Sequence, residues 1–257
     1  TKVERIDFVN QIVGWRYRWD YPGRYFLKKN ASKLTDIINR LNERDFGRVL
    51  ERKIIEIKPD VIHSFVIYLG GEKGLPVIEK FPNLKWIVST WGSDLYYYRN
   101  KKTYLDGIQR VLHKADYLFT DCKRDHKIAL ENGFRGKWLG AFPGGGGFSF
   151  SKIDPLMVPI AERRLILIKG YQGLHGKCIE VLKALEELKD LLGHYKIVVF
   201  GNGEEVEAYI QNSKLKAWLN LKLLGKISHQ GVLELMGKAK IYIGNSTSDG
   251  MPNTLLE

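Results

Sequence analysis

Strand-like and helix-like segments alternate along this chain, and that alternation limits the fold more than any other feature of the sequence. In the second half, short apolar runs such as Leu165–Ile168 and Ile197–Phe200 alternate with longer stretches in which apolar residues recur at helical spacing. Strands that alternate with helices are typical of βαβ units and parallel sheets. Right-handed crossovers then place the loops that follow the strands along one sheet edge, where ligands bind.

The individual segments are placed by their periodicity and their breakers. Residues 143–159 are rich in glycine and proline, which favours a connection between two α/β domains, 1–150 and 151–257; the alternative is a long loop inside one doubly wound domain. Both ends look incomplete, because Glu257 stops just inside an expected helix and the first half lacks an opening strand with a glycine-rich turn. Strands are expected at 7–13, 61–63, 86–89, 117–120, 165–168, 196–200, 221–224 and 241–243, and helices at 32–41, 49–58, 104–114, 122–132, 177–192, 204–211, 230–238 and from Leu255 onward.

The net charge of +12 is unevenly distributed along the chain. Residues 1–150 contain 27 Lys and Arg against 17 Asp and Glu, a balance of +10, whereas residues 151–257 contain 14 against 12, a balance of +2. An excess of positive charge attracts phosphate on nucleic acid, on an anionic membrane or on a substrate. The same excess is equally compatible with a solvated basic face that binds nothing specific.

Cysteine content and hydropathy narrow the class of protein. Cys122 and Cys178 have no paired spacing, which argues against a disulfide framework or a cysteine zinc site and suits a reducing compartment. No apolar run approaches the ~20 residues of a membrane helix, and residues 1–5 lead into no signal peptide. We therefore expect a cytoplasmic protein.

The last ten residues contain the most specific pattern. Residues 244–248 form a polar loop after an expected strand, and residues 249–253 then turn into a helix whose first peptide N–H groups are free to donate. A carboxylate accepts two hydrogen bonds and suits paired sugar or ribose hydroxyls, so Asp249 and Glu257 could both face a ligand. The alternative is that Asp249 only caps the helix and Glu257 is a solvated helix residue.

The pattern acidic-Gly-x-Pro-Asn-x-Leu-Leu-Glu resembles the signature of family 4 glycosyltransferases, which have the GT-B fold of two Rossmann-like domains facing a cleft. The seven residues between Asp249 and Glu257 match the family's spacing, although its first acid is usually Glu. The resemblance implies that Asp249 approaches the donor sugar and that Glu257 holds the ribose hydroxyls. The backbone between them would approach the sugar and the diphosphate, at Gly250, Met251, Pro252 and Asn253.

Other stretches resemble the same family in the same order. Residues 223–228 resemble its loop against the nucleotide base, which assigns donor contacts to Lys226 and Ile227, and residues 199–204 resemble its strand-turn with two glycines, including Gly201. The family binds the diphosphate with an Arg after the first strand of the second domain and a Lys at the start of the next helix. Lys177 matches that lysine.

The expected diphosphate site differs from that of the family at the position of the arginine. Tyr171, directly after Gly170, stands about where the family has Arg, so Lys169 or His175 would have to substitute for it. A cation such as Lys177 at a helix N-terminus opposes the helix dipole, which makes sense where an anion lies between them. The alternative is an ordinary exposed lysine.

In the first half, residues 59–64 and 90–94 resemble strand-end loops that face the cleft. The family's Thr-x-His-Gly loop reads Thr-Trp-Gly here, so its histidine is absent. His63, Trp91 and Asp94 remain as acceptor-side candidates. Their alternatives are a hydrogen-bonded structural histidine, a core tryptophan and a helix cap.

The resemblance implies transfer of a sugar from a nucleotide-diphosphate donor with retention of configuration, in surface polysaccharide or glycolipid synthesis, without an obligatory metal or other cofactor. The catalysis would be electrostatic and positional, with Lys177 on the diphosphate and Asp249 on the sugar. The +10 balance suggests an acceptor with phosphate or a carrier at the membrane surface, and we expect a carbohydrate or lipid-linked acceptor with peripheral contact to the inner face of an anionic membrane. Alternatives are an epimerase or phosphorylase of the same fold, an inactive binding protein, and a basic nucleic-acid-binding module, for which we find no recognisable motif.

Overall fold

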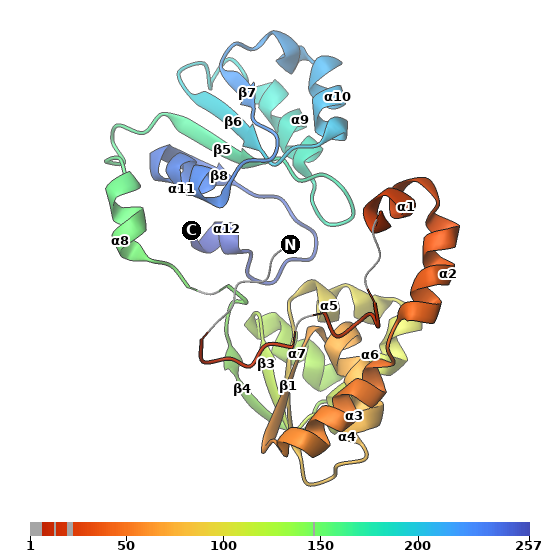
Figure 1. Ribbon diagram of the computed structural model, residues 1–257. Helices are drawn as coiled ribbons and strands as arrows, with labels where there is room; N and C mark the ends of the chain where they lie inside the picture. Colours follow the sequence, from red (N-terminus) through yellow and green to blue (C-terminus); the bar gives the residue numbers. More distant parts are fainter. Residues whose placement is uncertain (1–6, 13, 20–22, 146) are drawn as a thin grey trace. The chain divides into compact units, whose positions relative to one another are not determined.

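The computed structural model describes residues 7–12, 14–19, 23–145 and 147–257, without the side chains of Arg24 and Tyr25 (Figure 1). Its contacts divide the chain into two compact units. The first unit comprises the described residues up to Thr90, with Lys101–Phe119 and Ala129–Leu139; the second comprises Trp91–Asn100, Thr120–Ile128 and Gly140–Glu257. This division follows contacts and not one point in the chain, so the limits 1–150 and 151–257 stay a prediction.

The first sheet has four strands in the order β1-β2-β3-β4, and its first two pairings, β1 with β2 and β2 with β3, are parallel. Its core includes the strand residues Trp86 and Leu118 and the helix residues Ile108 and Leu112, all fully buried. The strands are β1 (Val61–Phe65), β2 (Lys85–Ser89), β3 (Tyr117–Thr120) and β4 (Lys137–Ala141). The helices are α1 (Arg24–Asn30), α2 (Ser32–Asn42), α3 (Phe46–Ile57), the π-helix η1 (Val66–Gly71), α4 (Glu72–Ile78), α5 (Ser93–Tyr96), the 3₁₀-helix η2 (Tyr98–Asn100), α6 (Lys102–Lys114) and α7 (Lys123–Glu131).

The second sheet is also four-stranded, in the order β7-β6-β5-β8, and all of its pairings are parallel. Successive strand residues point to opposite faces, so Ile166 and Ile168 pack on one face with Leu182 of α9, while Leu165 and Leu167 pack on the other. The strands are β5 (Leu165–Lys169), β6 (Lys196–Phe200), β7 (Leu221–Leu223) and β8 (Ala239–Ile243). The helices are α8 (Phe150–Ile153), η3 (Asp154–Leu156), α9 (Cys178–Leu188), α10 (Glu204–Gln211), η4 (Lys214–Ala217), α11 (His229–Lys238) and α12 (Asn253–Leu256).

The fold class that the sequence predicts is confirmed, because both sheets are parallel α/β sheets. The predicted strand at 7–13 is wrong over residues 7–12, which form turns and irregular chain; residue 13 lies outside the described residues. Its apolar residues Phe8 and Ile12 are exposed, so the alternation has no neighbouring sheet to pack on. The helix predicted at 177–192 ends at Leu188, and Leu191 beyond it is 72% exposed. Among the described residues, no helix combines the length and the apolar character needed to cross a bilayer.

The two cysteines should react with thiol reagents at different rates. Burial raises the pKa of Cys178 to about 11, and it also raises the pKa of Cys122. Cys178, the first residue of α9, is 1% exposed in the core, whereas Cys122 is only half-buried. Because the thiolate is the nucleophile, a chromogenic disulfide reagent at pH 8 should modify Cys122 first and Cys178 only after denaturant is added. Two equally fast thiols in the folded protein would contradict this, and a Cys122→Ser variant identifies the faster one.

Candidate functional site

The strand order of the second sheet has one switch point. β5 comes first in the chain, β6 and β7 are added on one side of it, and β8 returns to its other side. In open α/β sheets, ligands bind at such a point, beyond the carboxyl ends of the strands. A pocket of about 240 Å³ lies there, which we call the β5–β8 pocket. It is lined by Lys169, Tyr171, Tyr242, Ile243, Gly244, Asn245, Ser246, Asp249, Pro252, Thr254 and Leu255.

The loop after β5 brings two candidate residues into this pocket. Lys169 is the last residue of β5, and Tyr171 is exposed at the pocket wall. Gly170, between them, is buried and donates its N–H to Phe200 O at 2.7 Å, so it packs against β6 instead of lining the pocket. The structure therefore places the alternative cation, Lys169, at the pocket.

Lys177 is the N-cap of α9, so the helix begins at Cys178, one residue later than the sequence predicts. Its Nζ donates to Gly173 O at 3.2 Å, and it is not among the lining residues. Its backbone is nonetheless tied to the pocket, because its N–H donates to Asn245 O at 3.0 Å and its carbonyl accepts from Asn245 Nδ2 at 3.3 Å. The start of α9 is thus fixed beside a pocket wall.

The loop after β8 is held by a second set of hydrogen bonds. Thr247 N donates to His175 O at 2.9 Å, and the buried Ser248 hydroxyl lies 2.8 Å from His175 Nδ1. Ser248 Oγ also lies 2.9 Å from Ser93 Oγ. These contacts fix the two loops of the pocket to each other and hold the backbone directly before Asp249.

Asp121 anchors the turn that follows Asp249. One of its oxygens accepts from Met251 N at 2.8 Å and the other from Gly144 N at 3.2 Å. Gly250 lies so close to the Asp121 carboxylate that a Cβ would collide with it, which explains the glycine. Asp121 is 8% exposed, so these two peptide groups have a buried partner.

Arg124 supports the same turn from α7. Its Nη1 donates to Asp249 O at 3.3 Å, its Nε donates to Asp125 Oδ1 at 2.9 Å, and its guanidinium lies 3.9 Å from the centre of the Tyr96 ring. Burial raises the pKa of Asp125, and the nearby Arg124 opposes that rise. Sequence reasoning missed Asp121 and Arg124. The sequence signal that could have found Asp121 is an acidic residue directly after the predicted strand at 117–120, at the sheet edge where ligands bind.

The charges of both acidic residues of the last segment act on Tyr242. It lines the pocket and donates its hydroxyl to Thr254 Oγ1 at 2.9 Å. Burial raises its pKa first, and the charges of Glu257 and Asp249 raise it further. Asp249 is exposed and lines the pocket, as the sequence suggests. Glu257 is not among the lining residues and instead lies 2.7 Å, Oε1 to Nε2, from His229 at the start of α11.

Of the other candidates for donor binding, Pro252 lines the pocket and the rest lie outside its lining. Gly201 has a left-handed φ of 68° and donates to Gly225 O at 2.5 Å, which places the loops after β6 and β7 together. Lys226 is exposed and Ile227 packs on the core face of α11. Within the last segment, Pro252 lines the pocket and Asn253 begins α12.

The acceptor-side candidates fall in different units. His63, in the first unit, lies 2.7 Å from Ser89 Oγ through its Nε2 and stacks on Phe65, and burial lowers its pKa, which favours the neutral ring. In the second unit, Trp91 is 51% exposed, while the buried Asp94 accepts from Trp91 N at 2.7 Å. The Asp94 carboxylate therefore fixes its own turn, as the capping alternative predicts.

No protein-family model matches the chain, and no curated protein matches its sequence. Solved structures match its fold. Sucrose-phosphate synthase from Thermosynechococcus elongatus aligns at a TM-score of 0.56 and 15% identity, over 80% of this chain and 55% of that one. Anabaena Alr3699/HepE in complex with UDP and glucose aligns at 0.54 and 15%, over 79% and 58%. UDP-GlcNAc 2-epimerase from Methanocaldococcus jannaschii aligns at 0.51 and 14%, over 76% and 58%.

This chain spans little more than half the length of these three structures. At such identities the similarity shows the fold alone, which is the two-sheet GT-B fold that the sequence predicts. Among the residues that the structure describes, no three His, Cys, Asp or Glu side chains form a group that could hold a metal ion.

Proposed function

We propose that the chain transfers a sugar from a nucleoside-diphosphate donor to an acceptor hydroxyl, as a family 4 type glycosyltransferase that retains the anomeric configuration. The observation that carries the proposal is the β5–β8 pocket, where Lys169 and Asp249 lie together at the switch point of a parallel sheet. The fold similarity to a structure that holds UDP and glucose supports the same class of donor.

In this mechanism the bond between the sugar C1 and the diphosphate oxygen breaks, and a bond from the acceptor oxygen to C1 forms. The nucleoside diphosphate leaves, and the acceptor proton is released with it. Negative charge grows on the diphosphate during the reaction, so Lys169, Lys177 and the start of α9 would stabilise the transition state. Asp249 would accept hydrogen bonds from the sugar, and Glu257, beside His229, would hold the ribose hydroxyls.

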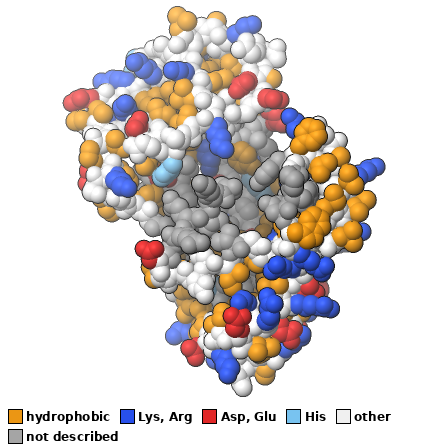
Figure 2. Space-filling view, in the orientation of Figure 1, with side chains coloured by type: hydrophobic (Ala, Val, Ile, Leu, Met, Phe, Trp, Pro, Cys, Tyr) orange, Lys and Arg blue, Asp and Glu red, His pale blue; other side chains and the backbone are white. Residues whose placement is uncertain are grey.

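The acceptor proposed is a carbohydrate or a lipid-linked hydroxyl in surface polysaccharide or glycolipid synthesis, in the cytoplasm and at the inner face of a membrane. Apolar side chains on α1 and α2, including Phe26, Ile37 and Leu41, are exposed in the unit that also carries several exposed arginines (Figure 2). Exposed apolar and basic side chains in one unit support peripheral contact with a membrane. No metal or other cofactor is part of the proposal.

A binding experiment tests the donor assignment. In a thermal-shift and calorimetry screen of nucleoside diphosphates and their sugars, at least one should bind the wild type and raise its midpoint by mass action. An Asp249→Asn variant should weaken binding of the nucleotide sugar about tenfold, because the amide loses charged acceptor capacity. Asp190→Asn changes an exposed acid of the same unit outside the pocket and should bind as the wild type does. If no nucleotide binds, the proposal fails.

A sugar-nucleotide epimerase is the second candidate, because an enzyme of that kind shares the fold. The two activities separate cleanly: an epimerase converts the nucleotide sugar without any acceptor, whereas a transferase releases nucleoside diphosphate only when an acceptor is present. A basic nucleic-acid-binding module would instead bind unrelated DNA with strong salt dependence and leave nucleotides unbound.

A further inference from the structure

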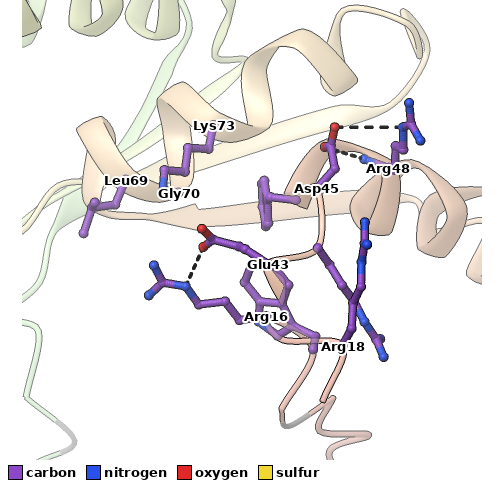
Figure 3. A pocket seen from close by; sticks show the side chains of 11 residues that line it. Arg16, Arg18, Glu43, Asp45, Arg48, Leu69, Gly70 and Lys73 are labelled. Atoms are coloured by element: carbon purple, nitrogen blue, oxygen red, sulfur yellow. Dashed lines mark hydrogen bonds and ion pairs between the residues drawn. The ribbon is translucent and has the colours of Figure 1, made fainter. Parts of the chain in front are cut away.

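The first unit contains a second cavity, of about 740 Å³, at the corner between α2 and α3 (Figure 3). We call it the basic pocket. A smaller cavity of about 400 Å³ shares four residues with it and adds Val49 and Arg52. The basic pocket is lined by Trp15, Arg16, Arg18, Glu43, Arg44, Asp45, Phe46, Arg48, Leu69, Gly70 and Lys73.

Positive charge exceeds negative charge at this pocket. Glu43 is already paired with Arg16, Nε to Oε1, at 2.6 Å, and this pairing raises the pKa of Arg16. Asp45 is used as the N-cap of α3, where it accepts from Arg48 N at 3.1 Å. The remaining cations are exposed and have no ion-pair partner among the described residues. They are Arg18, Arg44 and Lys73 in the basic pocket, with Arg52 in the smaller cavity.

Hydrogen bonds hold the backbone segments that carry two of these cations. Asn42 is 1% exposed and accepts from both Arg18 N and Trp19 N at 3.0 Å, while its own amide donates to Trp19 O. Arg44 N donates to Arg16 O at 2.8 Å. Because the chain around both arginines is held by hydrogen bonds, the backbone from which their side chains extend is fixed, so only the side chains have to be ordered on binding.

The other walls suit a small ligand with an organic part. The rings of Trp15 and Phe46 lie 5.3 Å apart, centroid to centroid, and form an aromatic wall. Lys73 reaches the cavity from α4, while Arg16 and Arg18 approach it from the N-terminal segment (Figure 3). The volume lies within the range of about 300–1,000 Å³ typical of small-molecule pockets. The start of α3 and the π-helix after β1 place the pocket at the carboxyl edge of the first sheet.

We propose that the basic pocket binds the phosphate group of a small organic phosphate, or of a phosphorylated lipid headgroup, with its organic part against Trp15 and Phe46. Arginine presents a planar fork that matches phosphate oxygens, and two or three unpaired cations balance the double charge of a phosphate monoester. A ligand that has only hydroxyl groups carries no charge to attract these cations. A single carboxylate carries half the charge of a phosphate monoester. The site is independent of the donor assignment, because all of its residues lie in the other unit.

Calorimetry on the full chain tests this site with defined probes: a hexose 6-phosphate, inorganic phosphate, the unphosphorylated hexose, a hexuronate, and vesicles with or without phosphatidic acid. We expect saturable binding of the phosphate probes, weaker binding of the hexuronate and none of the hexose. Arg18→Ala and Arg44→Ala should each weaken binding about tenfold or more. Arg40→Ala removes the same charge from the exposed face of α2 outside both cavities and should change the affinity less than about twofold.

The outcomes separate the sources and the two proposals. Binding of phosphatidic acid vesicles alone, lost in both arginine variants, assigns the phosphate to a lipid; binding of the soluble esters assigns it to a metabolite. Phosphate probes that bind no better than the hexose, or that bind both variants as tightly as Arg40→Ala, would overturn the site. Donor binding at the β5–β8 pocket, followed by its Asp249→Asn variant, is measured separately and stands or falls without this result.

Discussion

Replacing Lys169 with alanine should lower kcat/KM for transfer from a nucleotide sugar by about 100-fold to 1,000-fold, the usual effect of removing one preorganised group from a developing negative charge. Of the residues that line the described β5–β8 pocket, Lys169 alone carries a positive charge. As the last residue of β5, Lys169 lies at the strand end that leads through a short loop to the start of α9, whose free N–H groups favour an anion. The loss should appear mainly in kcat, because the charge on the diphosphate is larger in the transition state than in the bound donor.

Lys177→Ala tests the lysine that the sequence favours. Its ammonium donates to Gly173 O here, and it must turn from that carbonyl to reach a diphosphate, so we expect a loss of about tenfold or more. Lys216→Ala is the matched control, since Lys216 is exposed in the same unit and lies outside the pocket. Initial rates of nucleoside diphosphate release give all three values. Unchanged rates for both Lys169→Ala and Lys177→Ala would remove the phosphate site from the mechanism, and an unchanged rate for one would remove that lysine.

Sequence periodicity was sufficient for most of the second sheet. β5 and β6 are apolar on both faces, which is the pattern of a parallel strand covered by helices on both sides, and their limits differ little from the prediction. In the first half, β4 and α4 were not predicted. β4 is only half-buried, so its apolar signal is weak, and α4 carries Pro76 inside the helix, which reads as a breaker.

The candidate site could be predicted only in part, because its most specific contacts are long-range. Asp249 and Pro252 follow from the local pattern and do line the β5–β8 pocket. The partnership of Asp121 with Met251 joins residues 130 positions apart, and no local periodicity reports it. The contact of Glu257 with a ligand stays a prediction, and in the structure its Oε1 lies beside His229, a long-range partner that the local pattern does not report. The spacing of residues along the sequence predicts where the loop lies. Which of its side chains reach the cavity depends on tertiary contacts between distant residues.

Asp121→Ala should lower both the stability of the protein and its affinity for a nucleotide sugar. The change leaves the N–H groups of the half-buried Met251 and the exposed Gly144 without their acceptor, and an unsatisfied buried donor costs about 1–3 kcal/mol, a cost that water reduces at Gly144. For a chain of this size a loss of that order lowers the thermal midpoint by about 5 °C or more. The affinity should fall as well, because the freed turn carries Asp249 and Pro252 of the pocket wall.

Asp121→Asn separates the hydrogen bonds from the charge. Asparagine keeps one acceptor oxygen but removes the negative charge. In the wild type, the negative charge of Asp121 raises the pKa of the neighbouring Asp125 carboxyl. A raised folded-state pKa costs stability above that pKa, so neutralising Asp121 relieves part of this cost at pH 7. We therefore expect Asp121→Asn to lose less stability than Asp121→Ala, and Asp190→Ala, an exposed acid of the same unit, to lose almost none. If Asp121→Ala unfolded at the wild-type temperature and bound donor equally well, the anchoring role would be refuted, because the turn would then hold its shape without the carboxylate.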